Sequence, residues 1–172
     1  MTRRRGFTLI EIVLAFGLLG VLSLLMVATM RSNLDFSRKM DTAETLDRAV
    51  LVSVRFLRNE LRGASVSEPA DGELLNRLTF LKPRVGPATG NVVITAGAVE
   101  YEPDESQISL SDGTLIWTQG AESGIITSLG EEGEFSCERL DAETLEVRVK
   151  AKIVKDRDEM SGEREANVRF KI

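Results

Sequence analysis

The stretch RRRGFTLIEIVLAFGLLGVLSLLMVATM, residues 3–30, begins with three arginines and becomes almost wholly apolar after Gly6. Residues 12–30 of this stretch are 19 consecutive residues without a charge. As a helix they would be roughly 28 Å long, close to the ~30 Å hydrocarbon core of a bilayer. Only Ser23 and Thr29 interrupt the apolar run, whereas a helix in a soluble core would show a polar face. The segment therefore predicts a membrane-spanning helix.

The charges at the start of this segment set its orientation and raise a question. Arg3, Arg4 and Arg5 place the short N-terminus in the cytoplasm and the remaining chain outside. Glu11 then puts a carboxylate at the beginning of the apolar segment, where a charge weakens insertion. An ordinary membrane anchor has no use for this residue, so its presence needs a separate explanation.

Three interpretations of the segment follow from its residues alone. A cleaved secretory signal would have a shorter apolar region and an A-x-A-like site, which VATM at 27–30 does not provide. A twin-arginine export signal fits the paired arginines of TRRRGFTL, but Glu11 disfavours both export signals. The third interpretation is an unprocessed single-pass anchor that carries an extracytoplasmic binding domain.

The sequence RRRGFTLIE at 3–11 resembles the processing site of type IV prepilins, in which a short basic leader and a glycine precede Phe-Thr-Leu-Ile-Glu and a long apolar helix. The resemblance implies that a membrane-embedded prepilin peptidase cleaves between Gly6 and Phe7 on the cytoplasmic side. It also implies N-methylation of the new amino group of Phe7. Gly6 suits the peptidase because a residue without Cβ lets the backbone approach closely.

The same resemblance gives Glu11 a role in subunit assembly. Cleavage would create an ammonium group at Phe7 that is largely charged at neutral pH. In pilin-like filaments the stacked helices are offset, which can set the Glu11 carboxylate of one subunit beside the Phe7 ammonium of another. The implied partners are other minor and major pilin or pseudopilin subunits, the prepilin peptidase and the inner-membrane assembly platform. The implied location is the bacterial cytoplasmic membrane, with the filament forming in the envelope.

After Met30 the helical pattern continues with an amphipathic segment at residues 31–64. The apolar positions recur at intervals of three, four or seven and predict a buried stripe: Phe36, Met40, Ala43, Val50, Val54, Leu57, Leu61 and Ala64. Gly63 is a plausible stop signal for the helix. We expect one helix from Phe7 to Arg62 whose stripe packs on the protein's own sheet, rather than forming a coiled coil.

Residues 65–172 predict a β-rich headgroup. From Arg77 onward, short runs with a period of two alternate with Gly, Pro, Asp and Ser. The clearest strand is TLEVRVKAKIV at 144–154, and the segment KDRDEMSGERE between it and ANVRFKI at 166–172 predicts a solvated hairpin loop. Asp112-Gly113 is the strongest short hairpin signal in the chain. The expected fold is α+β and pilin-like, with the long N-terminal helix (residues 7–30 and 31–64, after a leader at 1–6) packed on an antiparallel sheet.

Beyond residue 30 the order of elements resembles the minor J-type pseudopilins of type II secretion and the related minor pilins of type IV pili. The similarity rests on RFLRNELRGAS at 55–65, then AVEYEPDES, then TLIW. It implies a minor subunit at or near the filament tip. Many major pilins carry a proline in the membrane half of the helix, and this chain has none there.

The composition argues against other functions. With 22 basic and 27 acidic residues the net charge is -5, and a surface of that sign is a poor partner for nucleic acid. The chain has no histidine, and its single cysteine, Cys137, has no histidine to activate it. We therefore expect no enzyme, no cofactor and no metal. The acidic groups Asp104-Glu105 and Glu131-Glu132-Glu134 are oxygen-rich and could hold calcium, as some pseudopilins do, but they lack the spacing of a known calcium loop, which favours solvated turns. Trp117 and Tyr101 lie in alternating runs, which predict cross-strand packing.

Overall fold

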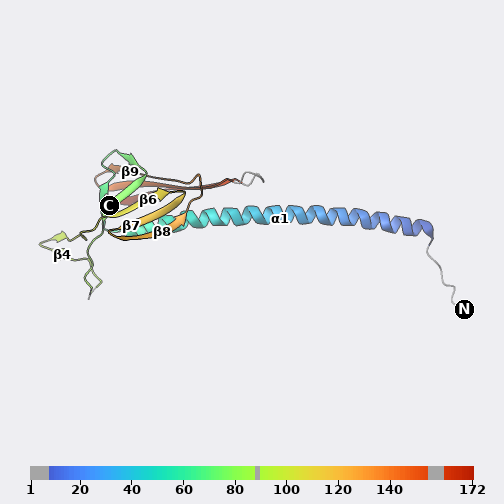
Figure 1. Ribbon diagram of the computed structural model, residues 1–172, viewed down its shortest axis with the longest axis horizontal. Helices are drawn as coiled ribbons and strands as arrows, with labels where there is room; N and C mark the ends of the chain where they lie inside the picture. The colour runs from blue at the N-terminus through green and yellow to red at the C-terminus, as the bar shows by residue number, and fades with distance from the viewer. Residues whose placement is uncertain (1–7, 88–89, 155–160) are drawn as a thin grey trace. The chain divides into compact units, whose positions relative to one another are not determined.

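The computed structural model of the chain describes residues 8–87, 90–154 and 161–172. The chain divides into two compact units, one ending at Asp41 and the other covering Thr42–Ile172. The helix α1, Leu9–Glu60, contributes its first part to one unit and its last part to the other (Figure 1). The fold class predicted from the sequence is confirmed, because a long N-terminal helix packs on antiparallel β-sheets in an α+β arrangement.

The first unit consists of the N-terminal part of α1. Its residues are mainly Leu, Val, Ala and Met without proline, a composition that favours an uninterrupted helix. Among the described residues, α1 is the one helix long and apolar enough to cross a membrane. Within the part of the chain that the structure describes, its large apolar side chains are exposed from Leu9 to Met30.

The second unit begins with the last part of α1, which buries one face. Leu46, Ala49, Val50, Ser53 and Leu57 are buried, and they recur at the three- and four-residue spacing of a single helical face. The helix ends at Glu60, followed by a turn in which Gly63 has a φ of +72°. That left-handed conformation suits glycine, and the predicted stop signal is confirmed.

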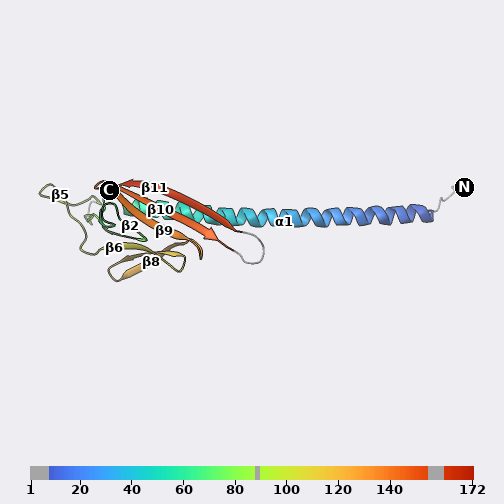
Figure 2. The same cartoon turned by 90° about the horizontal axis from the view of Figure 1, so that it is seen from above.

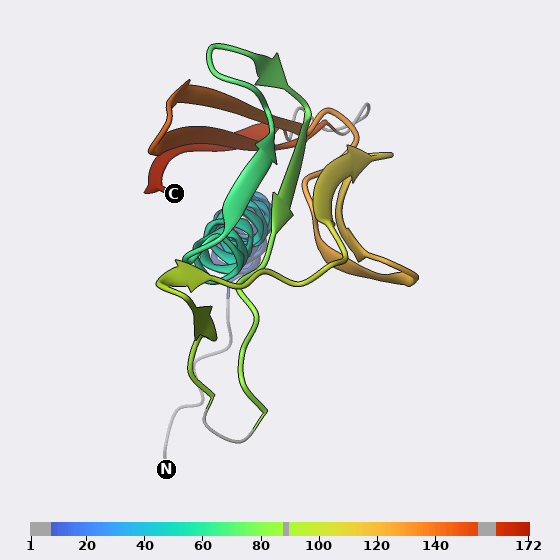
Figure 3. The same ribbon diagram turned by 90° about the vertical axis from the view of Figure 1, so that its left-hand side faces the viewer.

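A five-stranded sheet forms one wall of the second unit. Its strands are β1 (Ser65–Glu68), β3 (Arg77–Leu81), β6 (Ser106–Ser111), β7 (Thr114–Gln119) and β8 (Glu122–Ser128). They lie in the order β1-β3-β6-β7-β8, and every neighbouring pair is antiparallel (Figure 3). The β6–β7 hairpin turns at Asp112 and Gly113, whose φ values are +48° and +68°. Two positive φ angles match the tight turn that the Asp-Gly pair predicts.

A four-stranded antiparallel sheet forms the other wall. Its strands are β2 (Leu74–Leu75), β9 (Glu134–Asp141), β10 (Thr144–Ile153) and β11 (Gly162–Lys171), in the order β11-β10-β9-β2 (Figure 2). Leu145, Val147, Val149 and Ala151 of β10 are buried, as the alternating sequence predicts. A further pair, β4 (Ile94–Thr95) and β5 (Ala98–Val99), forms a small separate sheet.

The outer face of the four-stranded sheet carries ion pairs. Arg169 of β11 lies 2.8 Å from Glu146 of β10, and Lys152 of β10 pairs with Glu132. The hydrogen bond from Arg169 lowers the pKa of Glu146, and the hydrogen bond to Glu132 raises the pKa of Lys152. These exposed pairs give the sheet a solvated outer surface and contribute little to its stability.

The helix and both sheets share one hydrophobic core. The helical side contributes Leu46, Leu57 and Leu61 to it. The strands β3, β6, β7, β9, β10 and β11 contribute side chains that are at most 8% exposed: Leu78, Phe80, Ile108, Leu115, Phe135, Cys137, Leu145, Val147, Val149, Ala151 and Phe170. Close packing of such side chains is the main stabilising term for a unit of this size.

Several details of the sequence-based prediction need correction. The β-structure starts at Ser65 rather than Arg77, and it forms two main sheets rather than one. The predicted loop at 155–165 is strand β11 from Gly162 onward, while residues 155–160 lie outside the described residues. The runs NVVIT and AVEYEP yield only the two-residue strands β4 and β5, because neither joins a larger sheet.

The apolar stripe of the helix also differs from its prediction. Phe36 and Met40 were expected to be buried and are 66% and 55% exposed. Burial on the helix begins only at Leu46, and it includes the small side chains of Ala49 and Ser53. Small residues fit here because a helix that packs closely on sheets leaves little room for larger side chains.

Candidate functional site

The candidate site is the N-terminal end of α1. The predicted cleavage residues, Gly6 and Phe7, lie outside the described residues. The described chain begins at Thr8, immediately before the helix, and Glu11 lies in its first turn. Thr8 and Glu11 are therefore the residues of this site that the structure describes.

Thr8 and Glu11 are joined by reciprocal hydrogen bonds. The backbone N–H of Thr8 donates to Glu11 Oε2 at 2.8 Å, and the Thr8 hydroxyl donates to the same oxygen at 2.9 Å. The backbone N–H of Glu11 donates to Thr8 Oγ1 at 3.4 Å. This is a capping box, in which the residue before the helix and the third helical residue satisfy each other's backbone donors.

The capping box gives Glu11 a local function that the sequence analysis missed. Its signal is present in the sequence as Thr-x-x-Glu directly before a long apolar run. A carboxylate in the first turn also interacts favourably with the helix dipole. Glu11 therefore stabilises the start of its own helix whether or not it contacts another subunit.

The polar side chains of the apolar segment that follows are also compatible with a membrane environment. Its two hydroxyl side chains bond to the helix itself: Ser23 donates to the carbonyl of Leu19 at 2.8 Å, and Thr29 donates to the carbonyls of Leu25 and Met26. A polar group without a hydrogen-bond partner costs about several kcal/mol in hydrocarbon, and these hydrogen bonds avoid that cost. Both hydroxyls can therefore lie in lipid without an external partner.

The surroundings of Cys137 do not suit a nucleophilic thiol. It is fully buried on β9, where its Sγ lies 2.8 Å from the carbonyl oxygen of Arg77. Burial raises the pKa of the thiol to about 12, so it is protonated at neutral pH. A protonated, inaccessible thiol is a core residue and not a catalytic group.

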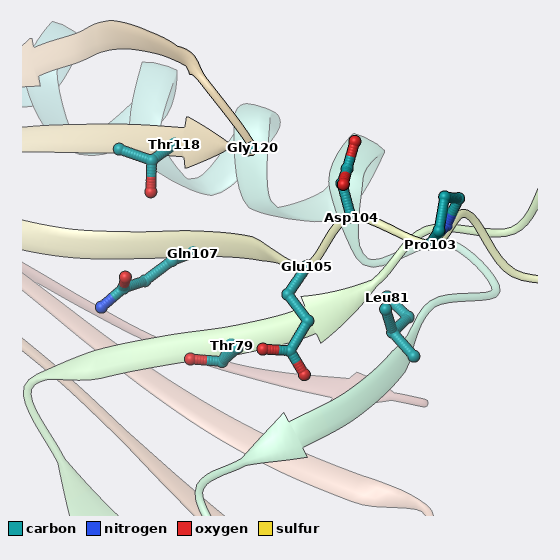
Figure 4. A pocket seen from close by; sticks show the side chains of 8 residues that line it. All are labelled: Thr79, Leu81, Pro103, Asp104, Glu105, Gln107, Thr118 and Gly120. Carbon is teal, nitrogen blue, oxygen red and sulfur yellow. The ribbon is translucent and has the colours of Figure 1, made fainter.

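The acidic groups do not converge on a common point. Asp104 and Glu105 line a hollow of about 670 Å³ beside β3, β6 and β7, but their carboxylates point to different sides of it (Figure 4). Glu132 and Glu134 pair with Lys152 and Lys150, respectively. Within the described parts of the chain, no group of three or more Asp, Glu or Cys side chains is arranged to hold a metal ion.

The two aromatic side chains differ in their environments. The ring of Trp117 packs in the partly buried layer next to the core, and the ammonium of Lys82 lies 4.7 Å from its centroid. Lys82 also pairs with Glu60 at the end of α1 at 2.5 Å. Trp117 therefore helps to join the five-stranded sheet to the helix, as a packing role predicts. Tyr101 forms an isolated β-bridge with Pro83, and its side chain is 38% exposed.

The comparisons with known proteins point to the same end of the chain. Residues 1–27 match a protein family described as the prokaryotic N-terminal methylation motif. No curated protein and no solved structure matches the chain. The matched residues include Gly6, Phe7, Thr8 and Glu11, so the structural and the family observations concern the same segment.

Proposed function

We propose that this chain is a type IV pilin-like protein with a structural rather than a catalytic role, which the family match at residues 1–27 supports. The motif and the exposed apolar helix fit a membrane-anchored protein that assembles with other pilin subunits after the action of a prepilin peptidase.

We propose that this chain is a minor subunit of a type IV pilus or of a type II secretion pseudopilus. The peptidase cleaves between Gly6 and Phe7, the Phe7 amino group is methylated, and the subunit assembles through its N-terminal helix at or near the filament tip. The headgroup lies outside the cytoplasmic membrane. The observation that supports this most strongly is the methylation motif at residues 1–27, which overlaps the exposed apolar part of α1.

Glu11 connects the local geometry to assembly. Its Oε2 accepts both hydrogen bonds from Thr8, while its Oε1 accepts none from the described residues. One oxygen caps the helix and the other is available to the Phe7 ammonium of a neighbouring subunit. Pairing with that ammonium lowers the cost of a carboxylate near lipid, so the charge favours the docked state over the free one.

The substitution Gly6→Leu tests the processing step. The variant should insert in the membrane as the parent does, because the apolar segment is unchanged. It should stay uncut, because a large side chain beside the scissile bond keeps the backbone away from the peptidase. Membrane fractionation and the intact mass of the protein measure both properties. A Gly6→Leu protein of normal mature mass would contradict the proposal, and Gly6→Ala, which adds one methyl group, is the matched control.

A further inference from the structure

One face of the helix in the second unit is exposed and carries an unusual set of side chains. Six residues recur at intervals of one, three or four, which places them on one side of a helix: Arg48, Leu51, Val52, Arg55, Arg58 and Arg62. We call them the basic stripe. All six are exposed, and Leu51 and Val52 are 68% and 38% exposed. The stripe lies opposite the buried face of Leu46, Ser53 and Leu57.

The four arginines of the stripe have no ion pair and no hydrogen bond within the described residues. Every other described arginine of residues 42–172 is in an ion pair: Arg77, Arg84, Arg139, Arg148, Arg164 and Arg169. Two nearby acids on α1 pair with residues outside the helix, Asp47 with Arg164 and Glu60 with Lys82. Among the described residues of the headgroup, the unpaired guanidinium groups therefore lie together in the basic stripe.

The charge of the rest of the chain makes this concentration more pronounced. Without these four arginines the chain would have 18 basic and 27 acidic residues, a net charge of -9 instead of -5. Like charges one turn apart on a helix repel each other and disfavour it. An acidic partner would relieve this repulsion, and guanidinium groups bind carboxylates through paired hydrogen bonds.

The apolar side chains in the stripe point to a protein partner. Leu51 and Val52 lie between Arg48 on one side and the other three arginines on the other. An apolar centre with a charged surround, rich in arginine, is the usual composition of a protein–protein interface. Binding to carboxylates alone would not require an aliphatic side chain as exposed as Leu51.

We infer that the basic stripe is the surface on which a neighbouring, different subunit of the same filament docks, through Asp and Glu side chains placed around an aliphatic centre. The inference rests on the proposed function, because it takes its partner from the filament. It adds a second contact, outside the membrane segment, to the one made by the N-terminal end of the helix.

Photo-crosslinking in the producing cells tests this inference in the full-length protein. A photoreactive amino acid replaces Leu51, and in a control it replaces Ile125, which is 77% exposed on β8. The Leu51 probe should crosslink to another polypeptide with a prepilin-type N-terminus, at a peptide rich in Asp and Glu, and the Ile125 probe should not. Arg55→Glu combined with Arg58→Glu should lower the yield about tenfold or more, whereas Arg55→Lys with Arg58→Lys keeps the charge and should lower it less.

Several outcomes would overturn the inference. They are the absence of a crosslink at Leu51, a crosslink to a second copy of this chain or to lipid, and an unchanged yield in the double Glu variant. The intact mass of the same samples separates this result from a failure of the proposed function. A processed, methylated protein without the expected crosslink overturns the docking surface alone, whereas a protein that keeps residues 1–6 overturns both.

Discussion

Thr8 and Glu11 are coupled through one carboxylate oxygen, since the Thr8 backbone N–H and the Thr8 hydroxyl both donate to Glu11 Oε2, at 2.8 and 2.9 Å. The pair closes the N-terminal end of a helix whose large apolar side chains from Leu9 to Met30 are exposed among the described residues. An acidic residue in this position thus has two candidate functions, a cap for its own helix and a charge for a neighbouring subunit. The two functions require different properties of the side chain, so they can be separated by substitution.

Glu11→Ala should abolish assembly but not processing. Removal of a charge from an apolar segment leaves insertion as good or better, and the cleavage residues Gly6 and Phe7 are unchanged. A charge pair in a membrane-like setting contributes a few kcal/mol, more than the ~1 kcal/mol of an exposed pair, and each kcal/mol is about fivefold in an equilibrium. Co-purification with partner subunits, normalised to processed protein, should therefore fall strongly. Recovery of partner subunits equal to that of the parent protein would show that Glu11 does not contribute to docking.

Glu11→Gln is the matched control that separates the charge from the cap. Glutamine at this position can still accept the hydrogen bonds from Thr8, so it preserves the capping box. If docking depends on the charge, Glu11→Gln should lose partner subunits nearly as completely as Glu11→Ala. Thr8→Val removes the capping hydroxyl, which costs about 1 kcal/mol of helix stability. This variant should lose far fewer partner subunits. The opposite order of the two variants would make the cap, and not the charge, the important property.

A fragment of residues 31–172 should be soluble, monomeric and folded, with helix and sheet visible by circular dichroism. The core side chains from Leu46 to Phe170 are all retained in it. Shortening the fragment to residues 42–172 should leave its urea midpoint nearly unchanged, because burial on the helix begins at Leu46. Removal of residues up to Arg55 should unfold it, since four buried positions are lost. A fragment that needs detergent would contradict this account of the headgroup.

Two glycines with similar backbone angles should differ in their tolerance of a methyl group. A Cβ at Gly113 would lie 2.2 Å from the carbonyl oxygen of Gly130, whereas a Cβ at Gly72 would meet no atom within 4 Å. Both have positive φ, so Gly72→Ala should cost about 1–2 kcal/mol from the left-handed backbone alone. Gly113→Ala should cost about 1–3 kcal/mol more, from overpacking against backbone. Urea unfolding of the 31–172 fragment measures both, and equal costs would contradict the close approach.

The sequence predicted the elements whose signals are local. The alternation of Leu145 to Ala151, the Asp112-Gly113 turn and the stop at Gly63 each depend on a few neighbouring residues, and each is confirmed. Strand β1 was missed because Ser65–Glu68 has too few apolar residues to show an alternation, and it pairs with β3 through tertiary contacts. The burial of Ser53 and the exposure of Phe36 were not predictable either, because they depend on which part of the helix the sheets cover.

The candidate site was predicted in the same uneven way. Glu11 stands out in the sequence as a charge in an apolar segment, whereas its pairing with Thr8 depends on where the helix begins. The unmatched arginines of the basic stripe were not identified from sequence. Their distinction lies in the absence of ion pairs, and that property depends on where Arg164 and Lys82 come to lie.

The most direct test of the central claim is the intact mass of the protein purified from membranes of the producing cells. The account predicts a chain that lacks residues 1–6, begins at Phe7 and carries one additional methyl group on its amino terminus. Tandem mass spectrometry of the N-terminal peptide would locate the methyl group on Phe7. A protein that retains the leader, with Met1 or Thr2 as its first residue, would contradict the claim and favour an unprocessed membrane anchor.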